Sequence, residues 1–186
     1  MTERERKSVL RSIRIRNSLQ KTLEQDAEVQ GISVNALVNA ILTRYAEWDR
    51  FADKFGFITI TKFGYATMFE EIPDQKLDQF AERMGSQNAR DMTLFWFKRL
   101  GLDPFLAYLS LVARYARTFQ FEIDRQASEV TLLVQTDLGA RHARFLLHFL
   151  SGAIHSVVGA VPRTQTGRNS VTFRFRAPPV PPSLTE

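Results

Sequence analysis

Apolar and polar residues alternate near the start of the chain, over Ser12, Ile13, Arg14, Ile15 and Arg16. This period of two predicts a short β-strand with Ile13 and Ile15 on one face and the polar residues on the other. No second strand pattern lies nearby. A lone strand of five residues is not stable in water with its backbone unpaired, so this one requires a partner strand.

A helical period replaces the alternation after residue 16. Leu19, Leu23 and Ala27 recur at helical spacing and predict a first helix. We expect Asn17 or Ser18 to cap this helix at its N-terminus.

A second helix follows closely. Gly31 is expected to end the first helix, and Ser33 is expected to cap the second. The second helix carries an apolar stripe of Leu37, Val38, Ile41, Leu42 and Tyr45. The period continues beyond this stripe, so we expect the helix to run on to about residue 55, with a first domain at 12–47 and a helical connector at 48–56. The alternative is that the aromatic residues of 48–55 form the contact between two domains.

One strand and two small amphipathic helices bury too little surface to fold alone. The economical solution is a second copy of the chain. The strand would then pair antiparallel with itself across a two-fold axis, and the helices of both copies would cover one face of the ribbon. Ile13 and Ile15 would face the shared core, while Ser12, Arg14 and Arg16 would point outward from each copy.

Residues 12–45, SIRIRNSLQKTLEQDAEVQGISVNALVNAILTRY, resemble a ribbon–helix–helix DNA-binding domain of the Arc, MetJ and CopG type. The resemblance rests on the alternating strand, the apolar positions of both helices, the turn at Gly31 and the Ser-Val-Asn start of the second helix. It covers 34 of the 186 residues. It implies a homodimer whose two-stranded ribbon lies in the major groove of double-stranded DNA.

By position, the resemblance also implies a set of DNA contacts. The residues that contact base edges would be Ser12, Arg14 and Arg16, and an Arg can donate two hydrogen bonds to guanine. The residues that hold a phosphate would be Ser33, Val34 and Asn35, at a helix N-terminus that offers free N–H donors. An exposed edge strand kept soluble by charge is the alternative interpretation of the two arginines.

The net charge is concentrated at the N-terminus. Residues 1–21 carry seven basic and two acidic side chains, a surplus equal to the formal charge of +5 of the whole chain. This asymmetry indicates a polyanionic partner. Residues 1–11 are therefore predicted to be a basic arm that contacts DNA phosphates through Arg4, Arg6, Lys7 and Arg11. A solvated tail without a partner is the alternative.

The remainder of the chain predicts an α+β domain over 57–176 with a small antiparallel sheet. A strand is expected at 57–61. Helices are expected near 62–71, 74–84, 88–99 and 104–117, with Asp74 and Asp103 as caps and Gly85 and Gly101 as stops. Two hairpins are expected, 120–124 with 129–136 and 160–164 with 170–176, on either side of a long helix at 139–158. Residues 177–186 are rich in proline and are expected to be disordered.

Several classes of chemistry find no support in the sequence. The chain has no Cys, which excludes disulfides, thiolate metal sites and a cysteine nucleophile. No phosphate-loop, dinucleotide-binding or nucleophile-elbow motif occurs. His142, His148 and His155 share one predicted helix at spacings unsuited to a common metal ion, and are interpreted as structural or surface residues. We therefore expect neither an enzyme nor a cofactor, and a cytoplasmic protein without a membrane span.

These patterns predict a homodimeric, sequence-specific transcriptional regulator, such as a repressor, whose domain at 57–176 oligomerises or binds a small-molecule or protein ligand. An antitoxin or plasmid-partition protein, whose C-terminal domain binds a protein partner, is one alternative, and an enzyme or sensor that carries a DNA-binding domain is another. Antitoxin tails are usually short, whereas 57–176 has the pattern of an independently folded domain. The operator, the ligand, the direction of regulation and any assembly beyond the dimer stay open.

Overall fold

The computed structural model describes residues 9–178 of the chain, which falls into two compact units, Met1–Phe55 and Gly56–Glu186. The division coincides with a left-handed residue, because Gly56 has a φ of 66°. Glycine adopts this conformation without strain, so the chain can change direction where the last helix of the first unit ends.

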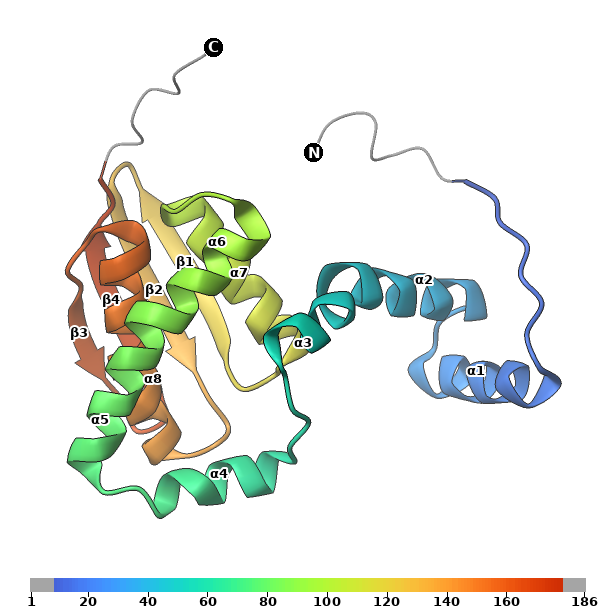
Figure 1. Ribbon diagram of the computed structural model, residues 1–186, viewed down its shortest axis with the longest axis horizontal. Coiled ribbons are helices and arrows are strands. Elements are labelled where there is room, and N and C mark those ends of the chain that lie inside the picture. The colour runs from blue at the N-terminus through green and yellow to red at the C-terminus, as the bar shows by residue number, and fades with distance from the viewer. Residues whose placement is uncertain (1–8, 179–186) are drawn as a thin grey trace, which may run out of the picture. The chain divides into compact units, whose positions relative to one another are not determined.

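The first two helices of the first unit are joined by a tight turn (Figure 1). α1 spans Asn17–Gln30 and α2 spans Val34–Arg44. Gly31 has φ 64° and ψ 31° and ends α1 in the left-handed conformation, as predicted. Ser33 caps α2, also as predicted.

The structure corrects the predicted start of α1 and confirms that the chain stays helical beyond α2. α1 begins directly after Arg16, whose side chain forms no capping bond, so the predicted cap at Asn17 or Ser18 is wrong. Beyond α2 the chain stays helical through a π-helical turn, η2 (Tyr45–Asp49), into α3 (Arg50–Phe55). The expected helix to about residue 55 is therefore present, with one wider turn inside it.

The second unit contains five α-helices and two π-helical turns among its described residues. They are α4 (Lys62–Glu70), α5 (Asp74–Arg83), η3 (Met84–Asn88), α6 (Ala89–Phe97), α7 (Leu102–Tyr115), α8 (Ala140–Ala153) and η4 (Ile154–Val158). The long helix expected at 139–158 is thus α8 extended by η4.

Two predicted helix stops and two predicted caps in this unit are wrong. Gly85 lies inside a continuous helical stretch from α5 through η3 to α6, and Lys98, with a φ of 57°, ends α6 instead. Gly101 precedes α7 as its N-cap residue. The caps expected at Asp74 and Asp103 are first-turn residues, where their charge still favours the helix dipole.

The strand expected at 57–61 is also wrong. This segment is extended but pairs with no other strand among residues 9–178. Its β-branched residues favour an extended backbone, yet a strand also needs a partner, and none is supplied.

The sheet has four antiparallel strands in the order β1-β2-β4-β3. They are β1 (Gln120–Gln126), β2 (Glu129–Gln135), β3 (Arg163–Thr166) and β4 (Ser170–Arg176). Both predicted hairpins are present, and β2 pairs with β4 at the centre of the sheet. The α+β class with an antiparallel sheet is therefore confirmed, although the described strands all lie in this unit and no N-terminal ribbon forms within one chain.

The core lies between the sheet and the helices that cover one of its faces (Figure 1). α8 packs against β4, and α5 packs against α8. The contact between these helices is unusually close, because a Cβ atom on Gly85 would overlap the carbonyl oxygen of Phe149, and one on Gly152 would lie 2.8 Å from the carbonyl oxygen of Glu82. Gly85 is therefore required by helix packing, which explains why it does not end a helix.

No helix within residues 9–178 has both the length and the apolar character needed to cross a bilayer.

Candidate nucleic-acid interface

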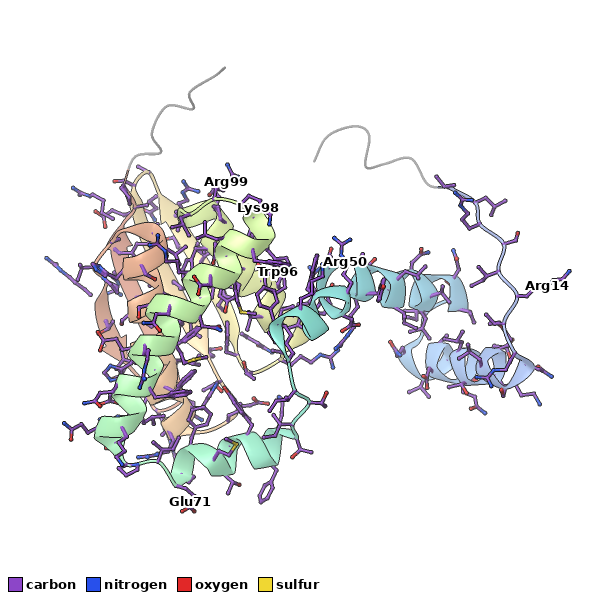
Figure 2. The ribbon with its side chains drawn as sticks, in the orientation of Figure 1. Arg14, Arg50, Glu71, Trp96, Lys98 and Arg99 are labelled. Carbon is purple, nitrogen blue, oxygen red and sulfur yellow. The ribbon has the colours of Figure 1, made fainter. Side chains whose placement is uncertain are left out.

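The segment before α1 is stretched out and forms neither helix nor sheet within one chain (Figure 1). Ile13 and Ile15 are 69% and 38% exposed, although both are large apolar side chains. Ser12, Arg14 and Arg16 are exposed as well. In Figure 2 the side chain of Arg14 points away from the helices. The residues predicted to contact bases are therefore accessible. Their apolar neighbours, Ile13 and Ile15, are not buried against other apolar side chains, although large apolar residues are usually buried.

The helices of this unit bury very little. Ala27 and Leu37 are the buried apolar residues of the described part of the unit. Six further large apolar side chains of α1, α2 and their flanks are exposed: Leu19, Val29, Ile32, Ile41, Leu42 and Tyr45. A unit of this size with two buried side chains has too small a core to be stable by itself.

The N-terminus of α2 is formed as predicted. Ser33 has extended dihedrals, φ −73° and ψ 151°, and its Oγ accepts a hydrogen bond of 3.1 Å from the backbone N–H of Ala36. The first helical N–H groups, those of Val34 and Asn35, have no carbonyl partner in a helix and stay available for an anion. Ser33 and Asn35 are exposed, so a phosphate can approach them.

The predicted DNA contacts thus fall into three groups. Ser12, Arg14 and Arg16 precede α1, and the residues predicted to hold a phosphate, Ser33–Asn35, form the N-cap and first turn of α2, within the same compact unit. No hydrogen bond in the described part of the chain joins these two groups. Arg11 is exposed at the start of the described chain, whereas Arg4, Arg6 and Lys7 lie outside the described residues.

The three histidines of the second unit are not brought together. His142 is buried, with its Nδ1 2.8 Å from the hydroxyl of Thr136, and burial lowers the pKa of His142 to about 4. It is therefore a neutral core residue near neutral pH. His148 Nε2 lies 3.2 Å from Oδ1 of Asp78, in a salt-bridge network. Across residues 9–178 no cluster of three or more His, Asp or Glu side chains could hold a metal ion.

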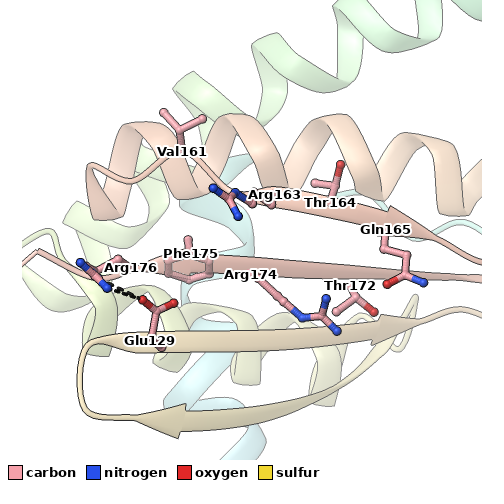
Figure 3. A pocket seen from close by; sticks show the side chains of 9 residues that line it. All are labelled: Glu129, Val161, Arg163, Thr164, Gln165, Thr172, Arg174, Phe175 and Arg176. Atoms are coloured by element: carbon pink, nitrogen blue, oxygen red, sulfur yellow. Dashed lines mark hydrogen bonds and ion pairs between the residues drawn. The ribbon is translucent and has the colours of Figure 1, made fainter.

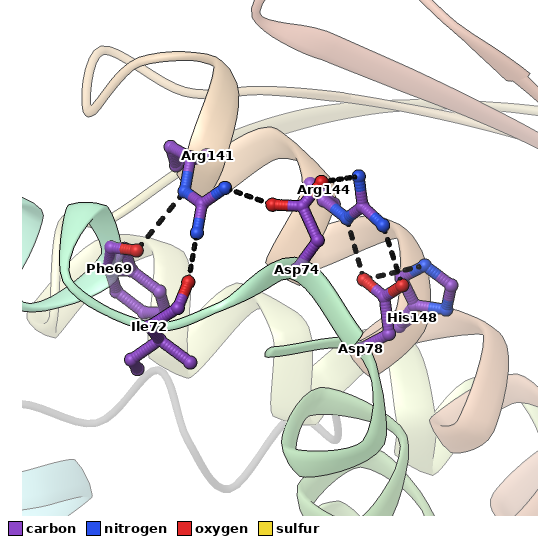
Figure 4. A network of polar contacts seen from close by, with 7 residues as sticks. All are labelled: Phe69, Ile72, Asp74, Asp78, Arg141, Arg144 and His148. Atoms are coloured by element: carbon purple, nitrogen blue, oxygen red, sulfur yellow. Dashed lines mark hydrogen bonds and ion pairs between the residues drawn. The ribbon is translucent and has the colours of Figure 1, made fainter. Parts of the chain in front are cut away.

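The largest polar network of the second unit joins α5 to α8 (Figure 4). Arg144 donates to both oxygens of Asp78 at 2.7 Å and to Asp74 at 2.7 Å. Arg141 donates to Asp74 and to the carbonyl oxygens of Phe69 and Ile72. The hydrogen bond from Arg144 holds the pKa of Asp78 below its usual range. Because each charge in this network has a partner, the network holds the two helices together.

Comparison with protein-family models and with curated proteins finds no match for this chain. The candidate interface therefore rests on the chemistry and exposure of its own residues. The sequence analysis assigned no function to Arg163, Arg174 and Arg176, which the strand register places on one side of the sheet. The alternation of Arg with Phe in β4 was a signal for two of them, but only the strand order shows that the third lies beside them.

Proposed function

We propose that this protein is a homodimeric, sequence-specific DNA-binding regulator of transcription. The observation that carries the proposal is the unpaired segment 12–16, in which exposed Ile13 and Ile15 alternate with exposed arginines. Such a segment gains both backbone partners and apolar cover when it pairs with a second copy of itself.

The pairing gives each side of the ribbon a distinct task. Ile13 and Ile15 face the apolar side chains that α1 and α2 leave exposed, and both copies contribute to that core. Arg14 and Arg16 point the other way. The major groove of B-DNA is about 12 Å wide and admits a two-stranded ribbon, and the arginines carry donors suited to guanine edges.

The other two groups supply affinity without reading bases. The N–H groups of Val34 and Asn35, together with Ser33, bind a phosphate and set the ribbon's position in the groove. The basic residues of the first 11 positions neutralise further phosphates and make binding sensitive to salt.

The second unit supports a regulator more than an antitoxin. Its described residues form a compact α+β structure with a buried core of its own, which requires no toxin to complete it. In a regulator such a unit binds a ligand or a further subunit and thereby modulates the DNA-binding unit.

Arg14 is the most informative residue for a test, because Arg16 is also the N-cap residue of α1, so its replacement could disturb the start of that helix. On a duplex recovered by random-oligonucleotide selection, Arg14→Ala should lose about 1–3 kcal/mol for each bidentate contact and relax base preference. Arg14→Lys is the matched control. It retains the charge, so it should keep affinity for a scrambled duplex while losing discrimination on the selected one.

Arg6→Ala separates the arm from the ribbon. It should weaken selected and scrambled duplexes alike and reduce the slope of log affinity against log salt by roughly one unit for each phosphate that the arm no longer neutralises. The function is refuted if selection enriches no sequence, and the site assignment is refuted if Arg6→Ala erases base preference while Arg14→Ala leaves it intact.

A further inference from the structure

The sheet of the second unit has one face against the helices and one face that they leave open. Val130, Leu132 and Val134 of β2 are buried and face the helices. The alternate residues point to the other side, which Figure 3 shows from close by. We call this side the outer face. It is formed by Glu122, Asp124, Gln126, Glu129, Thr131, Leu133, Arg163, Gln165, Thr172, Arg174 and Arg176.

Opposite charges are segregated on the outer face. The acidic residues Glu122, Asp124 and Glu129 lie on β1 and β2, and the basic residues Arg163, Arg174 and Arg176 lie on β3 and β4. The face as a whole is therefore neutral. Since neighbouring strands are about 4.8 Å apart, β1 and β3 are separated by roughly 14 Å, too far for most of these charges to pair within one sheet.

Two arginines on this face repel one another. Arg163 and Arg174 are directly opposite partners in the register of β3 and β4. Like charges in such positions destabilise a sheet. Neither residue forms an ion pair with a carboxylate within residues 9–178, whereas Arg176 lies 2.8 Å from Glu129. On the acidic side, Asp124 accepts a hydrogen bond from Gln126 but forms no ion pair among the described residues.

The arrangement of these charges is self-complementary. One row across the sheet reads Asp124, Thr131, Arg174, Arg163 from β1 to β3. Consider a two-fold axis that lies above the outer face, parallel to the strands and between β2 and β4. Rotation about this axis places the same row of a second copy opposite the first row, in reverse order. Asp124 of one copy then meets Arg163 of the other, and the same contact recurs across the axis.

We propose that the outer face binds the outer face of a second copy of this chain about that axis. Thr131, Leu133 and Thr172, which are half-buried and uncharged, form the centre of the contact, and the charges surround it. A nucleic-acid duplex fits this face less well, because its phosphates would lie against the acidic half. The proposal requires neither DNA nor the N-terminal ribbon, so it goes beyond the proposed function.

The test uses the full chain carrying Ile13→Lys, so that ribbon pairing does not contribute. Two double variants reverse one half of the face each: Arg163→Glu with Arg174→Glu, and Glu122→Arg with Asp124→Arg. Sedimentation velocity should show association of the parent and its loss in each double variant alone. An equimolar mixture of the two variants should regain association, because each unlike pair is then restored. Lys98→Glu with Arg99→Glu reverses the same number of basic residues outside the outer face and should leave association intact.

A parent that stays monomeric, or a mixture that stays monomeric, overturns the proposal. If the mixture stays monomeric but inorganic phosphate binds the parent and not the Arg163→Glu, Arg174→Glu variant, the face is an anion site instead. The ribbon is tested separately by the effect of Ile13→Lys itself, so failure of one contact is distinguishable from failure of the other.

Discussion

Replacing Ile13 with lysine tests the contact between two copies of the chain that would form the proposed DNA-binding ribbon of residues 12–16. Ile13 is 69% exposed in the single chain, and pairing of 12–16 across a two-fold axis would bury it. The substitution changes one side chain in a segment that makes no hydrogen-bonded sheet within the chain, so the fold of the single chain should not change.

The expected effect follows from the area that pairing would cover. Full burial of an Ile side chain contributes about 1.5–3 kcal/mol. The 69% that remains exposed therefore corresponds to about 1–2 kcal/mol for each copy and about 2–4 kcal/mol for a dimer. Lysine loses this contribution and also brings two ammonium groups toward an apolar core. The dissociation constant of the ribbon dimer should rise at least about 30-fold, and about 1,000-fold at the upper end of the burial range.

Sedimentation equilibrium over a micromolar concentration series measures this constant. The chain should also carry Arg163→Glu and Arg174→Glu, so that the outer face does not contribute to association. Ile13→Val, which keeps an apolar β-branched side chain, is the control and should shift the constant less than Ile13→Lys does, by about 3- to 30-fold. If Ile13→Lys associates as tightly as the Ile13→Val control, Ile13 does not face a shared core and the ribbon hypothesis is wrong.

Three further predictions concern stability. Gly85→Ala places a methyl group on the carbonyl oxygen of Phe149 and should lower the free energy of unfolding in urea by about 3 kcal/mol or more; a near-neutral result would mean that α5 and α8 can separate at little cost. Asp78 has a lowered pKa in the folded state, so its pairing with Arg144 contributes stability above about pH 4 that is lost as the pH falls further. Asp78→Asn should lower the free energy of unfolding by roughly 1 kcal/mol at pH 7. In urea titrations, the free energy of unfolding of this variant should also fall less steeply between about pH 5 and pH 2. If it falls as steeply as in the parent, other carboxylates cause the loss of stability in acid. Ser33→Ala removes the cap on Ala36 and should cost about 1 kcal/mol of stability while weakening selected and scrambled duplexes equally; loss of base preference would show that Ser33 does more than hold a phosphate.

Local patterns in the sequence were sufficient for much of the fold. The sequence predicted a last hairpin that pairs 160–164 with 170–176, and β3 and β4 form this hairpin, with β3 beginning at Arg163. It also predicted the long helix at 139–158 that α8 and η4 form. Gly31 and Ser33 were predicted as the stop and cap around the first turn. Each of these features depends on backbone sterics or on the burial of one apolar face of a helix or strand. Both leave a pattern in the sequence within a few residues.

Other features depend on residues far apart in the chain. Gly85 resembles a helix stop, yet the approach of Phe149 makes it a packing position within a continuous helix. Residues 57–61 have the composition of a strand, but pairing requires a partner that the fold does not supply. The strand predicted at 12–16 stays a prediction for the same reason, because a strand requires a partner and the described residues of one chain supply none.

The arginines before α1, the charge surplus of the first 21 residues and the order of the helices and hairpins all follow from the sequence alone. The strand order β1-β2-β4-β3, which puts Arg163 opposite Arg174 and separates both from the acids of β1, emerges only when the chain is folded. The same holds for the pairing of Arg144 with Asp78, 66 residues earlier in the chain. Composition and periodicity record which side chains a segment carries. Charge pairing acts over a few ångströms in space, so it depends on how distant segments are brought together.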